Sequence, residues 1–499
     1  MFYIMKKSVK ITLWVVGIAL GVFILLETCA DVAVSSIATK KARAAIEAAE
    51  LPFTVEFGRI HVLLMSATVD VTDIRFAANG KQLNNKGIDT VDVTLPVLSV
   101  RGIRYFDFIR NRRASVHSVK VSNLSAMYKE KKSKMSVKAD SLTITLHDLY
   151  YSLKDSTYGY NDSIYSIKFK HLKFIEPKGL IGIETSDFKT KNAGSITLGA
   201  TKIAHTMGKR QLGPIVKEPV SWLSMQLSKV EISPMNILRY ENFLKGVHLS
   251  KITVQGEKLE TLRDLRYKPT KPFPMPQEAI MQLKFPIAID QVDVSVKAID
   301  VNVLMTDKNC GELQVGKLNA TVRDFSNKKG SVMKVDLAAN LGNARAKGLF
   351  KMHMDKDCHF GLDLYGTNIE TSNLNKLLRP LTSMELDCVV DSLRASYTGD
   401  KVKAGGKVMM AYHGLSGKVY KGDEIPFKVI SQNAGALEYF VNHLIPKSNP
   451  RNDSKEPLTF NVEWEKKPEQ AFGFYMVGPL IMGAVQTFLP GLFQGKKAK

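Results

Sequence analysis

The densest group of side chains that could do chemistry lies at residues 353–359, which read His-Met-Asp-Lys-Asp-Cys-His. On one continuous strand, two imidazoles and two carboxylates of this stretch would share a face, and zinc accepts such ligands. However, Asp355-Lys356-Asp357 is also typical of a hairpin tip, because apolar alternation precedes and follows it. The turn is the favoured interpretation, and we predict neither a metal site nor a cofactor.

Sequence signatures of the common catalytic sites are missing from the chain. There is no Gly-x-Ser-x-Gly, His-Glu-x-x-His, Cys-x-x-Cys or phosphate-binding loop. The adjacent acids Asp423 and Glu424 follow Gly422 in what reads as a plain loop, without a base close by in the sequence. We therefore predict that the protein is not an enzyme.

An uncharged apolar stretch at residues 11–26 is preceded by three lysines and followed by two acids. This pattern predicts a single-pass transmembrane anchor at 11–30, with a cytoplasmic tail at 1–10 and the body on the far side of the membrane. The small residues Thr28-Cys29-Ala30 leave a cleaved signal peptide as the alternative.

The charge balance is strongly basic, with 70 Lys and Arg against 48 Asp and Glu, a net charge of +22. The basic residues indicate either a solvated surface or attraction to anionic lipid headgroups. They are spread along the predicted strands, so we expect no nucleic acid partner. The four cysteines do not make a disulfide scaffold.

After the anchor, residues 31–50 predict a helical stalk, and the hydrophobic period then changes from 3.6 to 2. The pattern predicts a mostly β fold of antiparallel strands with one apolar face, divided into β regions at 51–267 and 277–470. The proline-rich segment 268–276 is predicted as the linker between them. The clearest alternating runs contain Val91, Val93, Leu95, Leu142, Ile144, Leu146, Val292, Val294 and Val296.

Few segments could cover the apolar face of such a sheet. Helical patterns after the stalk occur only around 234–244 and 372–381. The sheet therefore either folds onto itself or leaves its apolar face to something that is not protein.

The last segment, 471–499, is apolar and ends in a basic tail. Residues 471–493 carry no charge but contain several glycines and prolines. Three interpretations stay open: a second membrane span, a segment lying in or on a membrane, and a buried cap on the sheet.

Three stretches resemble the AsmA-like family of Gram-negative envelope proteins, which has TamB and YhdP branches. Residues 51–80 (LPFTVEFGRIHVLLMSATVDVTDIRFAANG) look like the small strand-turn-strand unit that follows the anchor and helix in that family. Residues 88–131 resemble its succession of strand, short helix and strand. In residues 368–420, the helix SNLNKLLRPL precedes two strands and an AYHGL segment, as in AsmA-like C-terminal regions.

The resemblance implies an elongated, taco-like β-groove with an apolar floor that holds lipid acyl chains. It places the chain in the inner membrane with a periplasmic body, and implies a role in lipid transport between the inner and outer membranes. The partners would be phospholipid or another envelope lipid. The alternative, suggested by the TamB branch, is an assembly factor for outer-membrane or surface proteins. The nine alternating residues named above are the predicted floor, and the competing interpretation is that they form a closed protein core.

Overall fold

The structure is a computed structural model that describes residues 31–488 apart from internal gaps. The gaps are 49–53, 64–65, 80–86, 132, 153, 155–156, 161–164, 192–194, 220, 237–246, 268, 270, 284, 421–433 and 451–455. The predicted anchor at 11–30 therefore lies outside the described residues. Among the helices that are described, none combines the length and apolar character needed to cross a membrane.

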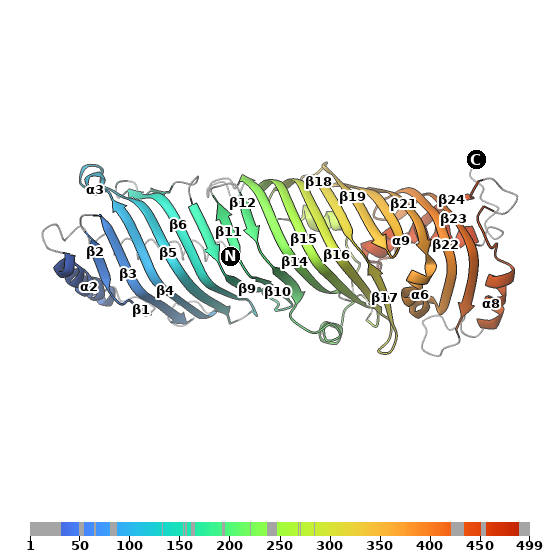
Figure 1. The fold of residues 1–499 in the computed structure, drawn as a ribbon, viewed down its shortest axis with the longest axis horizontal. Helices are drawn as coiled ribbons and strands as arrows, with labels where there is room; N and C mark the ends of the chain where they lie inside the picture. The colour runs from blue at the N-terminus through green and yellow to red at the C-terminus, as the bar shows by residue number, and fades with distance from the viewer. Residues whose placement is uncertain are drawn as a thin grey trace. The chain divides into compact units, whose positions relative to one another are not determined.

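The chain divides into two compact units, residues 1–202 and 203–499. Both are mostly β, as the alternating sequence predicts, and the strands of each lie side by side in Figure 1. The proline-rich segment 268–276, predicted as the boundary, instead lies within the second unit. We describe each unit separately.

Unit 1 begins with α2 (Asp31–Ala48) and contains α3 (Tyr105–Asn111) between two long strands. Its strands are β1 (Thr54–Glu56), β2 (Ile60–Leu63), β3 (Thr68–Asn79), β4 (Ile88–Ile103), β5 (Arg113–Glu130), β6 (Ser136–Ser152), β7 (Tyr158–Gly159), β8 (Tyr165–Phe169), β9 (His171–Ile175), β10 (Ile181–Thr185), β11 (Phe188–Lys191) and β12 (Ser195–Leu198). The strands β3 to β6 pair in sequence order, each antiparallel to the next.

The division between the units falls within β13 (Thr201–His205). The strands of unit 2 are β14 (Ser221–Asn236), β15 (Val247–Asp264), β16 (Ile287–Leu304), β17 (Cys310–Val315), β18 (Leu318–Ser326), β19 (Val332–Leu341), β20 (Ala344–His353), β21 (Phe360–Glu370), β22 (Met384–Gly399), β23 (Lys403–Val419) and β24 (Thr459–Glu465). Its helices are α4 (Leu212–Val216), α5 (Pro276–Met281), the 3-10 turn η2 (Thr371–Leu374), α6 (Asn375–Thr382), α8 (Ala434–His443) and α9 (Phe472–Phe488).

The prediction of a purely antiparallel sheet is wrong for the pair of strands β15 and β16. Strands β15 and β16 run parallel, in register from Val247 opposite Ile287 to Asp264 opposite Leu304. A parallel connection must carry the chain back along the whole strand, and that needs a dozen residues or more. Residues 265–286, which contain the proline-rich segment and α5, make this return. The sheet is therefore mixed.

Three residues with positive φ keep the apolar side chains of unit 1 on one face. Asp73, Asn123 and Ser141 have φ of 53°, 57° and 53° in the middle of β3, β5 and β6. Short polar residues tolerate this left-handed conformation better than most. At the first of these positions the apolar alternation slips by one residue, yet Val71 and Ile74 on either side belong to the same core.

The helix predicted as a stalk exists, but it packs along unit 1. Val34, Ala38 and Ala42 of α2 are completely or almost completely buried against β2 and its neighbours. The 372–381 prediction is confirmed by η2 and α6. Of the 234–244 prediction, residues 234–236 end β14 as strand, and the remainder lies outside the described residues.

Candidate functional site

In unit 1 the predicted floor residues lie on one apolar face. Val93 is opposite Phe76 on β3 and Ala126 on β5. Ile144 is opposite Val121 on β5 and Ile167 on β8. Because directly opposed residues point to the same side of a sheet, these pairs form apolar rows across the strands. The other predicted residues join similar rows through the pairs Val91–Ala78, Leu95–Ile74, Leu142–Leu124 and Leu146–Val119.

Unit 2 has a longer set of such rows. Val294 is opposite Val254 on β15 and Ala320 on β18. Two further rows lie on either side of the Val294 row. One begins at Val292, which is opposite Val322, and the other begins at Val296, which is opposite Leu318. By register the Val292 row continues through Val322, Val335, Phe350, Leu362, Tyr397, Gly406 and Val462.

Burial along the rows of unit 1 changes from strand to strand. Leu98 and Val100 of β4 are 2 % exposed beneath α2. On β6, by contrast, every residue from Asp140 to Ser152 is partly exposed. A strand with one fully covered face would show buried residues at alternate positions. Within the described residues, the apolar side of this stretch, including Ile144, is therefore only partly covered.

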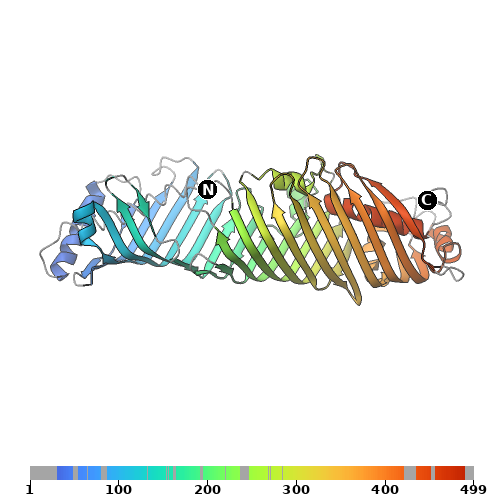
Figure 2. The ribbon, with the colours of Figure 1, turned by 90° about the horizontal axis from the view of Figure 1, so that it is seen from above.

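Unit 2 shows the same change in the opposite order along the chain. Val292, Val322 and Val335 of the Val292 row are partly exposed. Further along this row, Phe350, Leu362, Tyr397 and Val462 are 7 %, 8 %, 3 % and 1 % exposed. The difference follows from α9, which packs against the buried members. Figure 2 shows α9 crossing the strands of this end.

The helix α9 makes the C-terminal apolar segment a cap on the sheet across residues 472–488, which was one of its three open interpretations. It sits close because two of its glycines meet side chains of the sheet. A Cβ on Gly478 would lie 2.5 Å from the Trp464 ring, and one on Gly483 would lie 2.4 Å from Val408. Residues 489–499 lie outside the described residues.

Two buried tyrosines form hydrogen bonds that hold α9 against the sheet. The Tyr397 hydroxyl donates to the carbonyl of Met476 on α9. The Tyr475 hydroxyl of α9 donates to the carbonyl of Asp400 over 3.0 Å. Burial raises the pKa of both tyrosines, so both hydroxyls remain protonated donors at neutral pH.

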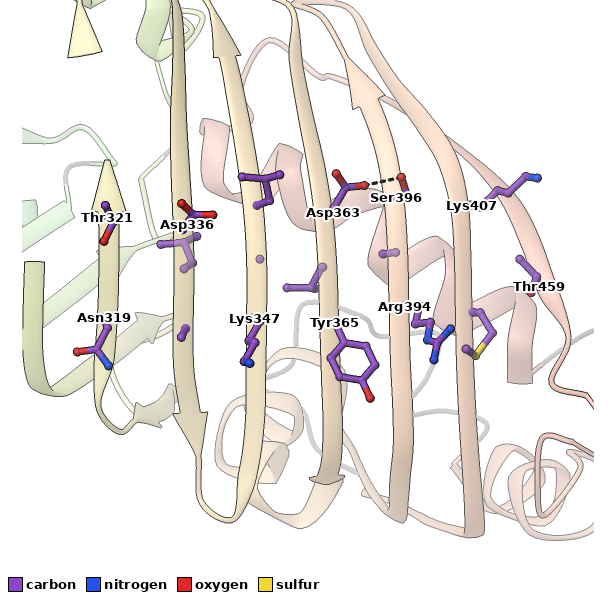
Figure 3. A pocket seen from close by; sticks show the side chains of 17 residues that line it. Asn319, Thr321, Asp336, Lys347, Asp363, Tyr365, Arg394, Ser396, Lys407 and Thr459 are labelled. Atoms are coloured by element: carbon purple, nitrogen blue, oxygen red, sulfur yellow. Dashed lines mark hydrogen bonds between the residues drawn. The ribbon is translucent and has the colours of Figure 1, made fainter. Parts of the chain in front are cut away.

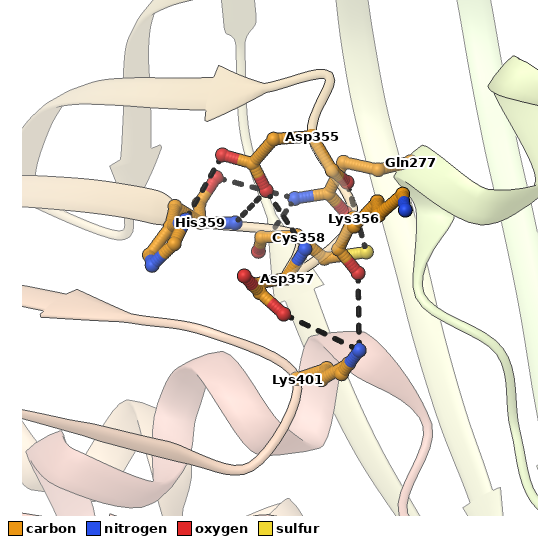
Figure 4. A network of polar contacts seen from close by, with 7 residues as sticks. All are labelled: Gln277, Asp355, Lys356, Asp357, Cys358, His359 and Lys401. Carbon is orange, nitrogen blue, oxygen red and sulfur yellow. Dashed lines mark hydrogen bonds and ion pairs between the residues drawn. The ribbon is translucent and has the colours of Figure 1, made fainter. Parts of the chain in front are cut away.

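The 353–359 stretch forms the predicted hairpin turn between β20 and β21 (Figure 4). The His359 Nδ1 lies 2.9 Å from the Asp355 carboxylate, and this contact raises the pKa of His359. Within the described residues, no group of three His, Cys, Asp or Glu is placed to hold a metal. Instead the turn holds α5: the buried Gln277 amide donates to the Cys358 carbonyl over 3.0 Å.

A depression of about 810 Å³ lies on the opposite, polar face of β18–β24 (Figure 3). Its labelled side chains alternate with the residues of the apolar rows along each strand. Asp363 accepts a hydrogen bond of 2.6 Å from Ser396, and Arg394 lies 5.6 Å from the Tyr365 ring centre. Lys347 and Lys407 also line it. These contacts are typical of a solvated, polar sheet face.

The same polar face carries cross-strand ion pairs in the open part of unit 2. Lys251 contacts Asp293 at 2.7 Å, and Lys297 contacts Glu257 at 2.6 Å. The Lys251 ammonium, together with Gln291, holds the pKa of Asp293 below its usual range. Asp293 therefore stays ionised beside Val292 and Val294, whose side chains point to the other face.

The structure thus places all nine predicted residues on apolar faces, six in unit 1 and three in unit 2. Leu95 and Val296 are buried at 8 % and 5 % exposure, and the other seven are partly exposed. Their role as lipid contacts stays a prediction. The sequence analysis did not predict that α9 packs against β23 and β24. The glycines Gly478 and Gly483 could have indicated this close packing.

Comparison with known proteins assigns no family. No family model matches the chain, and no curated protein matches it significantly.

Proposed function

We propose that the protein binds lipid acyl chains on the partly exposed apolar rows of its sheets and contributes to lipid transport between the inner and outer membranes of a Gram-negative envelope. The observation that carries the proposal is the Val292 row, which is apolar throughout and only partly covered where it crosses β16, β18 and β19. A groove shape, an inner-membrane anchor at 11–30, a periplasmic body and membership of the AsmA-like family belong to the same proposal.

The physical argument is that a continuous apolar row needs an apolar neighbour. Four strands, β15, β16, β18 and β19, present about 14 Å of floor at the usual strand spacing of ~4.8 Å. Each methylene group buried there contributes about 0.8 kcal/mol. Since the rows on neighbouring strands are in register, an acyl chain can move along them while its methylene groups stay in contact with apolar side chains.

Charge placed on the floor tests the proposal. Val294→Asp points an ionised carboxylate at the acyl chain, and burying such a charge is strongly unfavourable. The matched control is Ser295→Asp, which adds the same charge to the next residue on the polar face. In unit 1, Ile144→Asp and Thr145→Asp make an equivalent pair.

The measurement uses the full chain, purified in mild detergent and exposed to a phospholipid with a photoactivatable acyl chain. Mass spectrometry then maps the adducts. We expect adducts on the peptide containing Val292–Val296 and a loss of about tenfold in Val294→Asp, equivalent to ~1.4 kcal/mol. Ser295→Asp should retain the wild-type yield. Equal yields in both variants would exclude the floor, and lipid-free protein that cross-links to outer-membrane barrel proteins would favour the assembly-factor alternative.

A further inference from the structure

The short helix α3 in unit 1 exposes two large apolar side chains to solvent. Phe106 is 84 % exposed and Ile109 is 68 % exposed. Residues three apart on a helix lie on one face, so the two side chains form a single apolar knob. The opposite side of α3 is fixed to the sheet, because the Asp107 carboxylate accepts a hydrogen bond of 2.5 Å from the Ser115 hydroxyl on β5.

Arginines surround this knob. Arg104 precedes α3, Arg110 is in its last turn, and Arg112 and Arg113 follow it. Arg104 pairs with Asp148 at 3.2 Å, and Arg113 lies 3.6 Å from the Tyr150 ring centre. Arg110 and Arg112 are exposed to solvent. The only acid of α3 is Asp107, which faces the sheet, so the outer surface of the helix is cationic and apolar.

The backbone places α3 at one particular end of unit 1. The Val62 amide donates to the Ser35 hydroxyl and the Ile60 amide donates to the Thr39 hydroxyl, so the start of α2 lies beside the end of β2. The chain turns there into β3, and the Ile103 amide just before α3 donates to the Ala67 carbonyl over 3.2 Å. Residue 31, where the predicted anchor joins the described chain, is therefore at the same end as α3.

We propose that the exposed face of α3 docks on the surface of an anionic phospholipid membrane, with Phe106 and Ile109 inserted among the headgroups and Arg110 and Arg112 against the phosphates. Apolar side chains flanked by cations are the combination that holds a helix in the interfacial layer. Basic residues next to an anionic leaflet add electrostatic attraction. The site is separate from the apolar rows. It orients unit 1 on the membrane that would carry the predicted anchor, and in this respect it rests on the proposed function.

Depth of insertion tests the proposal in the full chain. The background carries Cys29→Ser and Cys310→Ser, since Cys358 and Cys388 are buried. An environment-sensitive fluorophore is attached at Ile109→Cys, and the control label is at Val402→Cys, which is 59 % exposed in unit 2. The chain is reconstituted into nanodiscs of phosphatidylcholine, with or without phosphatidylglycerol, that contain brominated acyl chains.

We expect bromine to quench the label at 109 at least about threefold more than the label at 402 in phosphatidylglycerol nanodiscs, and less in phosphatidylcholine alone. Arg110→Glu with Arg112→Glu should reduce this quenching while leaving Phe106 in place. Equal quenching at 109 and 402 would overturn the proposal, as would quenching that is indifferent to both phosphatidylglycerol and the arginines. Photo-lipid adducts on β16 are measured separately, so failure here leaves the proposed lipid floor unaffected.

Discussion

In unit 2 the same apolar rows pass from an open region to a covered one. The Val292 row is partly exposed on β16, β18 and β19, whereas beneath α9 its members Phe350, Leu362, Tyr397 and Val462 are buried. The row is made of apolar residues in both regions, such as Val322 and Val335 in the open one and Leu362 and Val462 in the covered one. The difference therefore comes from what lies on the rows, and it shows that an alternating apolar pattern specifies a face without specifying its cover.

Unit 1 also has a covered part and an open part of its apolar face, and there a different helix provides the cover. There α2 belongs to the core that buries β2 and parts of β3, β4 and β5, and β6 is left partly exposed from Asp140 to Ser152. In each unit a helix near one end of the chain closes part of the face. We interpret the covered regions as the parts that stabilise the fold and the open regions as the parts available to lipid.

The largest expected effect comes from truncating one leucine in each region of unit 2. Leu362 is 8 % exposed between Phe350 and Tyr397, so Leu362→Ala should lower the free energy of unfolding by about 2–4 kcal/mol. Leu337 of the open region is partly exposed, and Leu337→Ala should cost about 1 kcal/mol or less. Urea unfolding of the full chain in detergent, followed by circular dichroism, measures both.

If Leu362→Ala and Leu337→Ala lowered the free energy of unfolding equally, the distinction between covered and open regions would be wrong. Equal losses would mean that the open rows are covered in solution, either by a second copy of the chain or by residues outside the described ranges. Repeating the measurement with added phospholipid sharpens the result, because a ligand that binds only the folded state stabilises it. We expect lipid to increase the cost of Leu337→Ala and to leave that of Leu362→Ala unchanged.

A smaller effect is expected from lifting α9 away from the sheet. Gly478→Ala would place a methyl group 2.5 Å from the Trp464 ring, and overpacking of this kind costs about 1–3 kcal/mol. Gly473→Ala, near the start of the same helix, meets nothing within 4 Å and should be neutral or stabilise by up to ~1 kcal/mol. Hydrogen exchange of α9 peptides measures the difference.

Faster exchange in Gly478→Ala should extend to the rows that α9 covers, such as the β21 peptide with Leu362, and spare β16. If exchange of β16 rises equally, the two regions unfold as one unit and the comparison holds only for the static structure. If exchange is unchanged everywhere, α9 is not seated against Trp464 as the glycine contacts indicate.

Period-2 alternation allowed the strands to be predicted, including the slip between Val71 and Ile74. It also allowed the shared face of the six floor residues in unit 1, and that of the three in unit 2, to be predicted. It could not predict the parallel pairing of β15 with β16, because alternation is the same in both directions of a strand. Nor could the alternation show which of the three interpretations of residues 471–493 is right, because an uncharged apolar helix can pack against lipid or against the apolar face of a sheet. The knob of α3 was missed because Phe106 and Ile109 are ordinary apolar residues in sequence, and only their exposure distinguishes them.

The smallest expected effect is a pH dependence confined to the covered region. There the 355–359 turn holds α5 through Gln277. Contact with Asp355 raises the pKa of His359. The stability from this contact is therefore fully present below the ordinary histidine pKa of about 6.5 and is lost as pH rises through the raised value. Burial raises the pKa of Asp355, but hydrogen bonds from His359 outweigh this and lower it, so its contribution is lost on acidification.

Because His359 and Asp355 have side chains 55 % and 35 % exposed, the effect should stay below about 1 kcal/mol. Hydrogen exchange of the α5 peptide, corrected for the intrinsic pH dependence of exchange, should show weaker protection at pH 8 than at pH 6 in the wild type and no such change in His359→Gln. His353→Gln, which keeps the Asp355–His359 contact, should behave as the wild type does. A pH response of equal size on β16 would show that the turn acts on the whole face, and the covered and open regions would then be one cooperative unit.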